Sequence, residues 1–381
     1  MLTSKAYTHS DAKYEPIKAV EEEFFKKLGF RIPEDLMIVD VPIIFRGSWQ
    51  FIHTLHIPNP DAEDLIMIHG MGATGLCFFN LFHELSKKYN IWSLDLLGQG
   101  ASTRPNFIAS SDPEEAINFF IDSIERWRKE LGIEKATFLG HSFGGYLAGL
   151  YTIKYPQHVN RVIMISPAGF SKSPTLRERV SIERKIGFGY GILEKISFLL
   201  FKSHMTLPDL FQKYPTVVGQ AIQYYLQTKL KFEDTELFNL FLKYCYAYYA
   251  LPTGSQTALP NILSSHLGDA YLPIEEILEK KKLEIPFDFY YGERDPLNYK
   301  GVERLVEKER LKAALFFIED AGHQIIFENP KAICKMMIAR LEGAYKDSYG
   351  VVREKRSKIF APERENFTHW FKTLTWPRPS L

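Results

Sequence analysis

The chain turns from a strand into a helix at Gly140-His141-Ser142-Phe143-Gly144, which follows the apolar run Ala136–Leu139. A turn this tight leaves no room for side chains at its flanks, a demand that Gly140 and Gly144 meet. The turn also lifts the Ser142 hydroxyl clear of the carboxyl edge of the sheet. In this setting the G-x-S-x-G pattern predicts that Ser142 is a nucleophile, whereas on an ordinary loop it would be a chance match.

Two later residues supply the partners that a nucleophilic serine needs. A hydroxyl is a poor nucleophile near neutral pH, so Ser142 requires a base, and the base requires a carboxylate that holds its tautomer. Asp295 follows the strand-like run Pro286–Tyr291, and His323 follows the run Ala314–Ile318. Each thus lies just past the carboxyl end of a strand, where open α/β sheets build their sites. We predict His323 as the base and Asp295 as the acid.

Three other carboxylates compete with Asp295 for the role of the acid. They are Glu293, Asp320 and Asp269. An aspartate after a strand is also a common turn former or helix cap, so residue type and position do not exclude any of them.

A glycine-rich loop provides a further part of the predicted site. The strand-like run Asp64–His69 leads into Gly70-Met71-Gly72. An oxyanion on an acyl carbon needs backbone donors, normally the N–H after the nucleophile and one from such a loop. We therefore predict the backbone N–H groups of Phe143 and Met71 as the oxyanion hole. Phosphate binding is the alternative, but the loop continues into neither G-x-x-G nor Gly-Lys-Ser/Thr.

Composition limits the class of protein. The chain has 381 residues, 45% of them hydrophobic, and a formal net charge of +1, which provides no strong global attraction for nucleic acid. The three cysteines are too few and too far apart for a disulfide framework or a thiolate metal site, which favours a reducing compartment. No secretory signal begins the sequence, and no apolar run approaches the roughly 20 residues of a membrane span. The predicted chemistry needs no metal or organic cofactor.

The hydrophobic pattern predicts an α/β fold. Two alternating runs, Leu36–Phe45 and Trp49–Ile57, indicate an antiparallel hairpin. Helical spacing from Glu115 to Leu131 then lies between short strand-like runs, which predicts a mostly parallel central sheet flanked by helices. The strand-like runs are Leu65–Ile68, Ile91–Leu94, Thr137–Leu139 and Val162–Ile165.

A long insertion interrupts this pattern. We expect residues 36–166 and 283–345 to form the core, with residues 1–35 as an N-terminal extension and 167–282 as a helical lid. The lid should contain helices over Ile186–Phe201, Leu210–Thr228 and Glu236–Tyr249, with Gly187–Gly191 as a hinge or a plain loop. Its many aromatic residues either pack a small core of their own or favour long acyl chains beside the serine.

Several motifs together resemble one branch of the α/β-hydrolase family, over about Glu21 to Leu341. That branch contains N-acylphosphatidylethanolamine lipase, the lipid-droplet coactivator of triglyceride lipase and a mitochondrial cardiolipin deacylase. The chain order serine, aspartate, histidine is the order of this fold. The motifs are Asp95-Leu-Leu-Gly-Gln-Gly-Ala-Ser-Thr-Arg-Pro105, Gly140–Ala148, Tyr155-Pro156, Ser166–Phe170, Pro252–Ser255, Tyr291–Gly301 and Gly322-His323.

The resemblance implies a catalytic triad of Ser142, His323 and Asp295 acting on phospholipids or lysophospholipids. It also implies an intracellular protein at a membrane or lipid-droplet surface, and leaves mitochondrion, lipid droplet and cytoplasm open. Relatives often carry an aspartate five positions after the histidine, a feature linked to lysophosphatidic acid acyltransferase activity. Glu328 stands there instead, which favours hydrolysis over transfer. Pro296-Leu297 also replaces a tryptophan and a methionine, which leaves the shape of the pocket open.

The C-terminal extension, residues 346–381, has no counterpart in that resemblance. Its residues 351–381 carry a net charge of +4 together with several aromatic side chains. The extension is either solvated or docks on a membrane or a protein partner. We predict a serine hydrolase of the lipase type. The alternatives are a lysophospholipid acyltransferase and a non-catalytic subunit or coactivator of a larger assembly.

Overall fold

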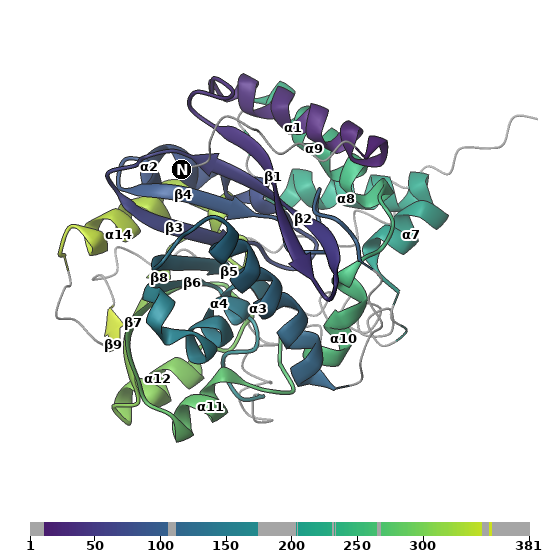
Figure 1. Cartoon of the computed structure of the whole chain (residues 1–381). Coiled ribbons are helices and arrows are strands. Elements are labelled where there is room, and N and C mark those ends of the chain that lie inside the picture. Colours follow the sequence, from purple (N-terminus) through teal and green to yellow (C-terminus); the bar gives the residue numbers. More distant parts are fainter. Residues whose placement is uncertain are drawn as a thin grey trace, which may run out of the picture.

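A twisted sheet of nine strands crosses the computed structural model (Figure 1), which describes residues 11–105, 112–173, 203, 205–230, 232, 234–264, 268–344 and 350–352. The strand order is β1-β2-β4-β3-β5-β6-β7-β8-β9. β1 and β2 form the predicted antiparallel hairpin, β2 runs antiparallel to β4, and all further pairs are parallel. The strands are β1 Met37–Phe45, β2 Ser48–Ile57, β3 Glu63–Ile68, β4 Tyr89–Leu94, β5 Ala136–His141, β6 Val159–Ile165, β7 Leu283–Gly292, β8 Leu311–Ile318 and β9 Gly350–Val352.

Helices cover both faces of the sheet, because the central parallel strands are apolar on both sides. In β3, Ile66 and Ile68 belong to one hydrophobic core, and Leu65 and Met67 belong to the other. The first core is closed by α3 Pro113–Glu130, α4 Phe143–Lys154, α11 Ile274–Lys280 and α12 Lys300–Glu307. The second is closed by α1 Glu15–Lys27, α2 Phe79–Leu85, α9 Thr235–Ala250 and α14 Pro330–Leu341.

Between β6 and β7 the described residues of the insertion are helical. They form α7 Leu207–Lys213, α8 Pro215–Lys229, α9, α10 Leu259–Ile262 and α11. The single helix expected over Leu210–Thr228 is wrong, because the chain breaks at Tyr214. Proline disfavours helical backbone in the residue before it, and Tyr214 has φ −135° and ψ 60° ahead of Pro215. The expected helix Ile186–Phe201 and the segment Gly187–Gly191 lie outside the described residues.

The remaining short elements connect these layers. They are α13 Ile325–Glu328 and the 3₁₀ helices Ala12–Tyr14, Gly75–Phe78, Pro156–His158 and Ser255–Ala258. Within the stretch expected to be a separate C-terminal extension, β9 pairs in parallel with β8 and so joins the sheet. The rest of that extension, residues 346–349 and 353–381, lies outside the described part of the chain.

Candidate active site

Ser142 occupies a strained turn between β5 and α4. Its φ of 53° and ψ of −118° lie outside the regions that L-residues favour. A Cβ at position 140 would lie 2.3 Å from the carbonyl oxygen of Gly144, and one at position 144 would lie 2.0 Å from that of Ile68. Only glycine therefore fits at the positions two before and two after the serine.

The structure places the predicted base beside this serine. His323 Nε2 lies 3.0 Å from Ser142 Oγ, a hydrogen-bonding distance for a hydroxyl that donates to a neutral ring nitrogen. His323 Nδ1 lies 3.3 Å from Asp295 Oδ1. The Asp295 side chain is 1% exposed, against 26% for His323. The three residues thus form a line from a partly exposed hydroxyl to a buried carboxylate, the arrangement that activates a serine.

The aspartate and the histidine face each other without a formed hydrogen bond. Asp295 Oδ2 and His323 Nδ1 are both buried and have no hydrogen-bond partner among the described residues. The backbone N–H of Leu297 donates to Asp295 Oδ1 at 3.0 Å and so holds the carboxylate in its loop. Catalytic hydrogen bonds are commonly long before substrate binds, and a small ring rotation would close this one.

The rival carboxylates lie elsewhere. Glu293 is exposed. Asp320 is 78% exposed and lies 3.9 Å from the Arg294 side chain. Asp269 lines a small cleft of which neither Ser142 nor His323 is part.

The glycine-rich loop lies against the serine turn, as an oxyanion hole requires. A Cβ at Gly70 would come within 3.1 Å of Ser142 Cβ. Phe143 is the first residue of α4, a position whose N–H has no acceptor within the helix. The Tyr249 hydroxyl of α9 donates to the carbonyl of Gly72 at 2.9 Å, so the insertion holds this loop in place. Phe143 and Met71 stay predicted donors.

Two side chains hold the backbone around His323, a role that the sequence indicates for neither. The Glu328 carboxylate accepts from the N–H of Gly322 at 2.7 Å and from the N–H of Gln324 at 3.0 Å. His141 Nε2 lies 2.9 Å from the carbonyl oxygen of His323 and donates to it. The next helix, α14, is capped by Asn329, whose side chain accepts from the N–H of Ala332.

Burial keeps the two neighbouring histidines neutral. It lowers the pKa of His141 to about 3, with the nearby His323 adding to the effect. Burial also lowers the pKa of His69 to about 4. Both rings therefore act as hydrogen-bonding groups rather than as charges near neutral pH, and neither repels a proton arriving on His323.

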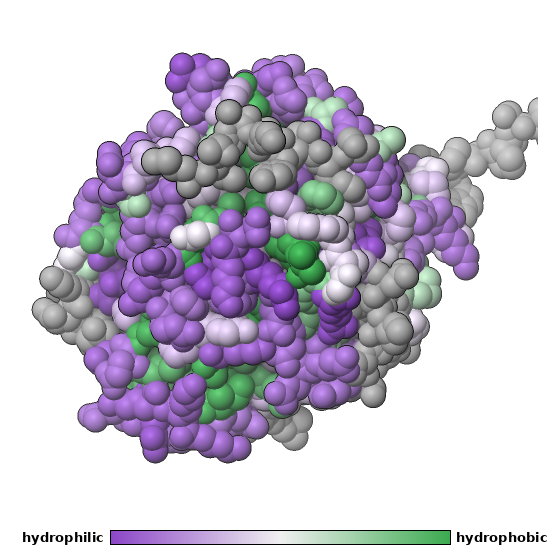
Figure 2. Space-filling model, viewed as in Figure 1, coloured by the Kyte–Doolittle hydropathy of each residue, from purple (hydrophilic) through white to green (hydrophobic). Residues whose placement is uncertain are grey.

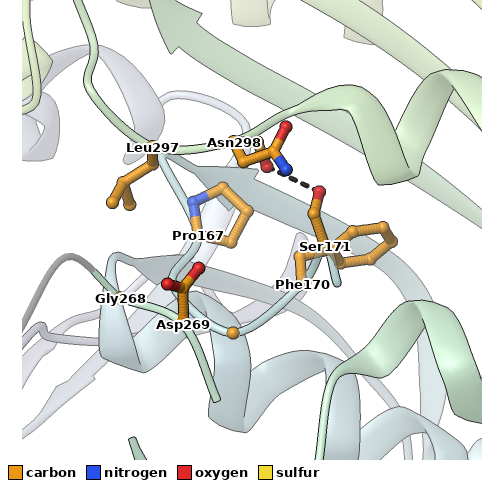
Figure 3. Close-up of a pocket in the computed structure, with 8 residues that line it drawn as sticks. Pro167, Phe170, Ser171, Gly268, Asp269, Leu297 and Asn298 are labelled. Atoms are coloured by element: carbon orange, nitrogen blue, oxygen red, sulfur yellow. Dashed lines mark hydrogen bonds between the residues drawn. The ribbon is translucent and has the colours of Figure 1, made fainter. Parts of the chain in front are cut away.

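A small cleft lies beside Leu297 and Asn298, the residues that follow Asp295 in the chain (Figure 3). Pro167, Phe170 and Gly268 line it together with Leu297 and Asn298. The Ser171 hydroxyl donates to the carbonyl of Asn298 at 2.6 Å across its edge. We regard the cleft as packing space beside the acid loop.

The described residues hold no group of His, Cys, Asp and Glu that could bind a metal ion. Within the same ranges, none of the helices combines the length and the apolar character needed to cross a bilayer.

Comparison with known proteins places this geometry in a family. Residues 65–330 match the alpha/beta hydrolase fold. The chain is 30% identical to human 1-acylglycerol-3-phosphate O-acyltransferase ABHD5, over 74% of this chain and 77% of that protein. It is 30% identical to mouse (lyso)-N-acylphosphatidylethanolamine lipase, over 73% and 78%. With the Arabidopsis thaliana 1-acylglycerol-3-phosphate O-acyltransferase it shares 29% identity over 71% of this chain, but only 64% of that relative.

Solved structures agree on the fold. A bacterial membrane phospholipase A superposes with a TM-score of 0.59 at 19% identity, covering 87% of this chain and 91% of that one. Naproxen esterase of Bacillus subtilis superposes with a TM-score of 0.57 at 15% identity, covering 88% and 100%. The predicted fold class and the predicted resemblance are therefore confirmed. The chain belongs to the α/β-hydrolase fold family.

Proposed function

We propose that this protein is a serine hydrolase of the lipase type that removes acyl groups from phospholipids or lysophospholipids. The observation that carries the proposal is the strained Ser142, whose hydroxyl lies 3.0 Å from His323 Nε2 with Asp295 behind the ring. Relatives named as a lipase and as acyltransferases of lipid substrates support the substrate class. Action at a membrane or lipid-droplet surface inside the cell belongs to the same proposal.

The proposed reaction follows from this geometry. Ser142 Oγ attacks the acyl carbon while His323 takes the hydroxyl proton, and Asp295 stabilises the imidazolium. The N–H groups of Phe143 and Met71 bind the oxyanion. The ester C–O bond then breaks, and the departing alcohol takes the proton from His323. Water repeats the sequence on the acyl-enzyme and releases a fatty acid.

Labelling with a fluorophosphonate tests the proposal directly. We expect the wild-type chain to be labelled at Ser142 and Ser142→Ala to lose both labelling and hydrolysis, with a residual rate roughly 10³-fold or more below wild type. Ser255, whose hydroxyl donates to the buried carbonyl of Leu97, provides the control, and Ser255→Ala should still be labelled. Labelling that persists in Ser142→Ala would refute the assignment.

Acyl transfer to a lysophospholipid is the second candidate, because several relatives are named for that reaction. The Glu328 carboxylate, which occupies the position linked to transfer, uses both oxygens on the backbone beside His323. The carboxylate is thus not free to orient a second lipid, and we expect water to react with the acyl-enzyme faster than the lysophospholipid does. With labelled phospholipid and lysophosphatidic acid as acceptor, free fatty acid should exceed transferred acyl product. The opposite ratio would make the chain an acyltransferase.

A non-catalytic subunit or coactivator is the remaining alternative. The presence of Ser142 beside His323 argues against it, because a chain selected only for binding has no need of a strained serine there. A chain that purifies with stoichiometric partners and resists the fluorophosphonate would favour this alternative.

A further inference from the structure

The exposed large hydrophobic side chains gather at one edge of the molecule. Eleven such side chains occur among the described residues. They lie on the β1–β2 hairpin, on the loop after β3, in residues 205–225 and at Tyr271-Leu272. Each of these segments follows or passes the carboxyl ends of the parallel strands, the edge that carries Ser142. The face seen in Figure 2 is largely hydrophilic, with hydrophobic residues only in separate spots.

The hairpin reaches beyond this edge. β2 pairs with β4 only from Thr54 opposite Leu94 to Ile57 opposite Ile91, and Leu94 is the last residue of β4. The first residues of β2 therefore extend about 20 Å beyond the last residue of β4, at roughly 3.3 Å per residue. The loop after β4 hydrogen-bonds to His53 and Phe51 along part of this stretch. Trp49, 65% exposed, and its cross-strand partner Ile44, 53% exposed, lie on this projection.

The outer face of α8 lacks charge. No charged residue occurs between Lys213 and Lys229, and the exposed positions include Val217 at 61%, Tyr224 and Tyr225. A surface helix in water normally carries charges on its outer face, as α3 does with Glu114, Glu115, Arg126, Lys129 and Glu130. The outer face of α8 is therefore suited to a less polar environment.

This surface continues into the candidate active site. Met71, 46% exposed, belongs to the loop that packs against Ser142. Tyr225 of α8 has its hydroxyl beside the Gln324 side chain, the residue after His323. The exposed apolar residues thus border the entrance to the serine on two sides.

We propose that these residues form a docking surface for a lipid bilayer, which we call the catalytic rim: Ile44, Trp49, Met71, Val217, Tyr224 and Leu272. The inference rests on the proposed function, since it places the entrance of the site against the membrane that holds the substrate. Trp49 and Tyr224, on two separate segments, fit the interfacial region of a bilayer, where amphipathic rings have one apolar and one wet side. None of these six residues is charged, and the neighbouring Arg46 guanidinium lies over the Phe45 and Phe119 rings. The rim therefore binds by apolar insertion rather than by charge.

Vesicle binding by the full chain tests the rim. Ser142→Ala serves as background so that the lipids stay intact, and the probe is unilamellar vesicles of phosphatidylcholine in a sedimentation assay. We expect Val217→Glu and Trp49→Glu each to weaken binding roughly tenfold, the effect of losing one buried large apolar side chain. Glutamate at position 217 lies in the first turn of α8, where a negative charge favours the helix. Gln157→Glu, exposed at the opposite edge before β6, adds the same charge and should bind as the parent does.

Two further readouts separate the explanations. Binding should persist at high salt, because apolar insertion is not screened. With Ser142 restored, Val217→Glu and Trp49→Glu should hydrolyse a soluble short-chain ester at the wild-type rate. If the wild-type chain does not hydrolyse this ester, the proposed function is refuted, whereas the proposal of the rim still depends on vesicle binding. The rim is overturned by vesicle binding that high salt abolishes, by equal binding of all three variants, or by a dimer that Val217→Glu dissociates.

Discussion

At the scale of single residues, the acid is the triad member that the sequence left most open. Asp295→Asn should lower kcat by roughly 10⁴-fold while the fold persists, because a neutral amide cannot stabilise the imidazolium that forms on His323. Glu293 lies two residues before Asp295 and is exposed, so Glu293→Gln is the matched control and should retain activity. Steady-state hydrolysis of a soluble ester measures both variants. A crippled Glu293→Gln beside an active Asp295→Asn would reverse the assignment.

Glu328 has a positioning role, since it contacts only the backbone on either side of His323. Glu328→Gln replaces one accepting oxygen by an amide that faces an N–H donor, so the histidine loop should loosen. We expect kcat to fall roughly 10- to 100-fold with KM little changed, because a small displacement of the base affects the chemical step. Glu328→Asp, one methylene shorter, should not restore the rate.

The exposed neighbour Glu319 provides the control for this prediction. Glu319→Gln should match the wild type in kcat and in thermal unfolding. A loss confined to KM in Glu328→Gln would assign the residue to substrate binding instead, and an unchanged kcat would remove it from the machinery.

At the scale of elements, a buried ionic cluster joins α1 to the β1–β2 hairpin. His53 Nε2 lies 2.7 Å from Glu21 of α1, and His53 Nδ1 lies 2.8 Å from Asp40 of β1. Burial opposes the charge on His53, but the two carboxylates outweigh it and raise its pKa well above the usual value. From α9, the Tyr244 hydroxyl lies 3.5 Å from Glu21 and donates to Thr74 at 2.9 Å. The cluster thus links the insertion to the hairpin that projects past the catalytic edge.

Removing the central cation should destabilise this joint. His53→Gln leaves the buried Glu21 carboxylate without its cation, whereas Asp40 keeps its ion pair with Lys18 at 2.6 Å. Breaking a buried ion pair in this way typically costs about 3 to 5 kcal/mol. Because the pKa of His53 is raised in the folded state, its positive charge stabilises the fold fully below the unfolded pKa of about 6.5. This stabilisation is lost as the pH rises through the folded pKa. The difference between wild type and His53→Gln in urea unfolding should therefore shrink at alkaline pH. A difference that grows with pH would contradict the charged state assigned to His53.

At the scale of the whole molecule, we expect two buried carboxylates, Asp40 and Glu125, to dominate the loss of stability in acid. Burial opposes ionisation of both, but His53 and Lys18 hold the pKa of Asp40 at about 2, and Arg128 and Tyr151 do the same for Glu125. Because the pKa values of these two carboxylates are lower in the folded state, their ionised forms stabilise the fold above the unfolded pKa of about 4. This stabilisation is lost as the pH falls toward about 2. Asp40 and Glu125 should each contribute about 2 to 3 kcal/mol of this loss.

Urea unfolding measured between about pH 5 and about pH 2 checks this expectation, because this range spans the unfolded and the folded pKa values. The double variant Asp40→Asn/Glu125→Gln should be less stable near neutral pH and should lose stability less steeply in acid. Parallel curves for the two proteins would mean that other carboxylates govern acid unfolding.

Much of the architecture could be read from neighbouring residues. Continuous apolar runs predict the parallel strands, because both faces of such strands are buried, and β3 supplies side chains to both cores. The steric demand of the turn at Ser142 is equally local, since Gly140 and Gly144 lie two positions away. The prediction from periodicity was wrong for the helix Leu210–Thr228, because the single residue Pro215 separates α7 from α8.

The amino-acid sequence alone thus determined the fold class and provided the predicted order of nucleophile, acid and base, because strand periodicity and turn chemistry depend on residues close in the chain. Only the tertiary structure decided which groups hold that site in place. His141 reaches the carbonyl of His323 across 182 positions, and Tyr249 reaches that of Gly72 across 177. Such pairs arise from the packing of the insertion and the loops around the sheet, and no spacing in the sequence encodes their distance.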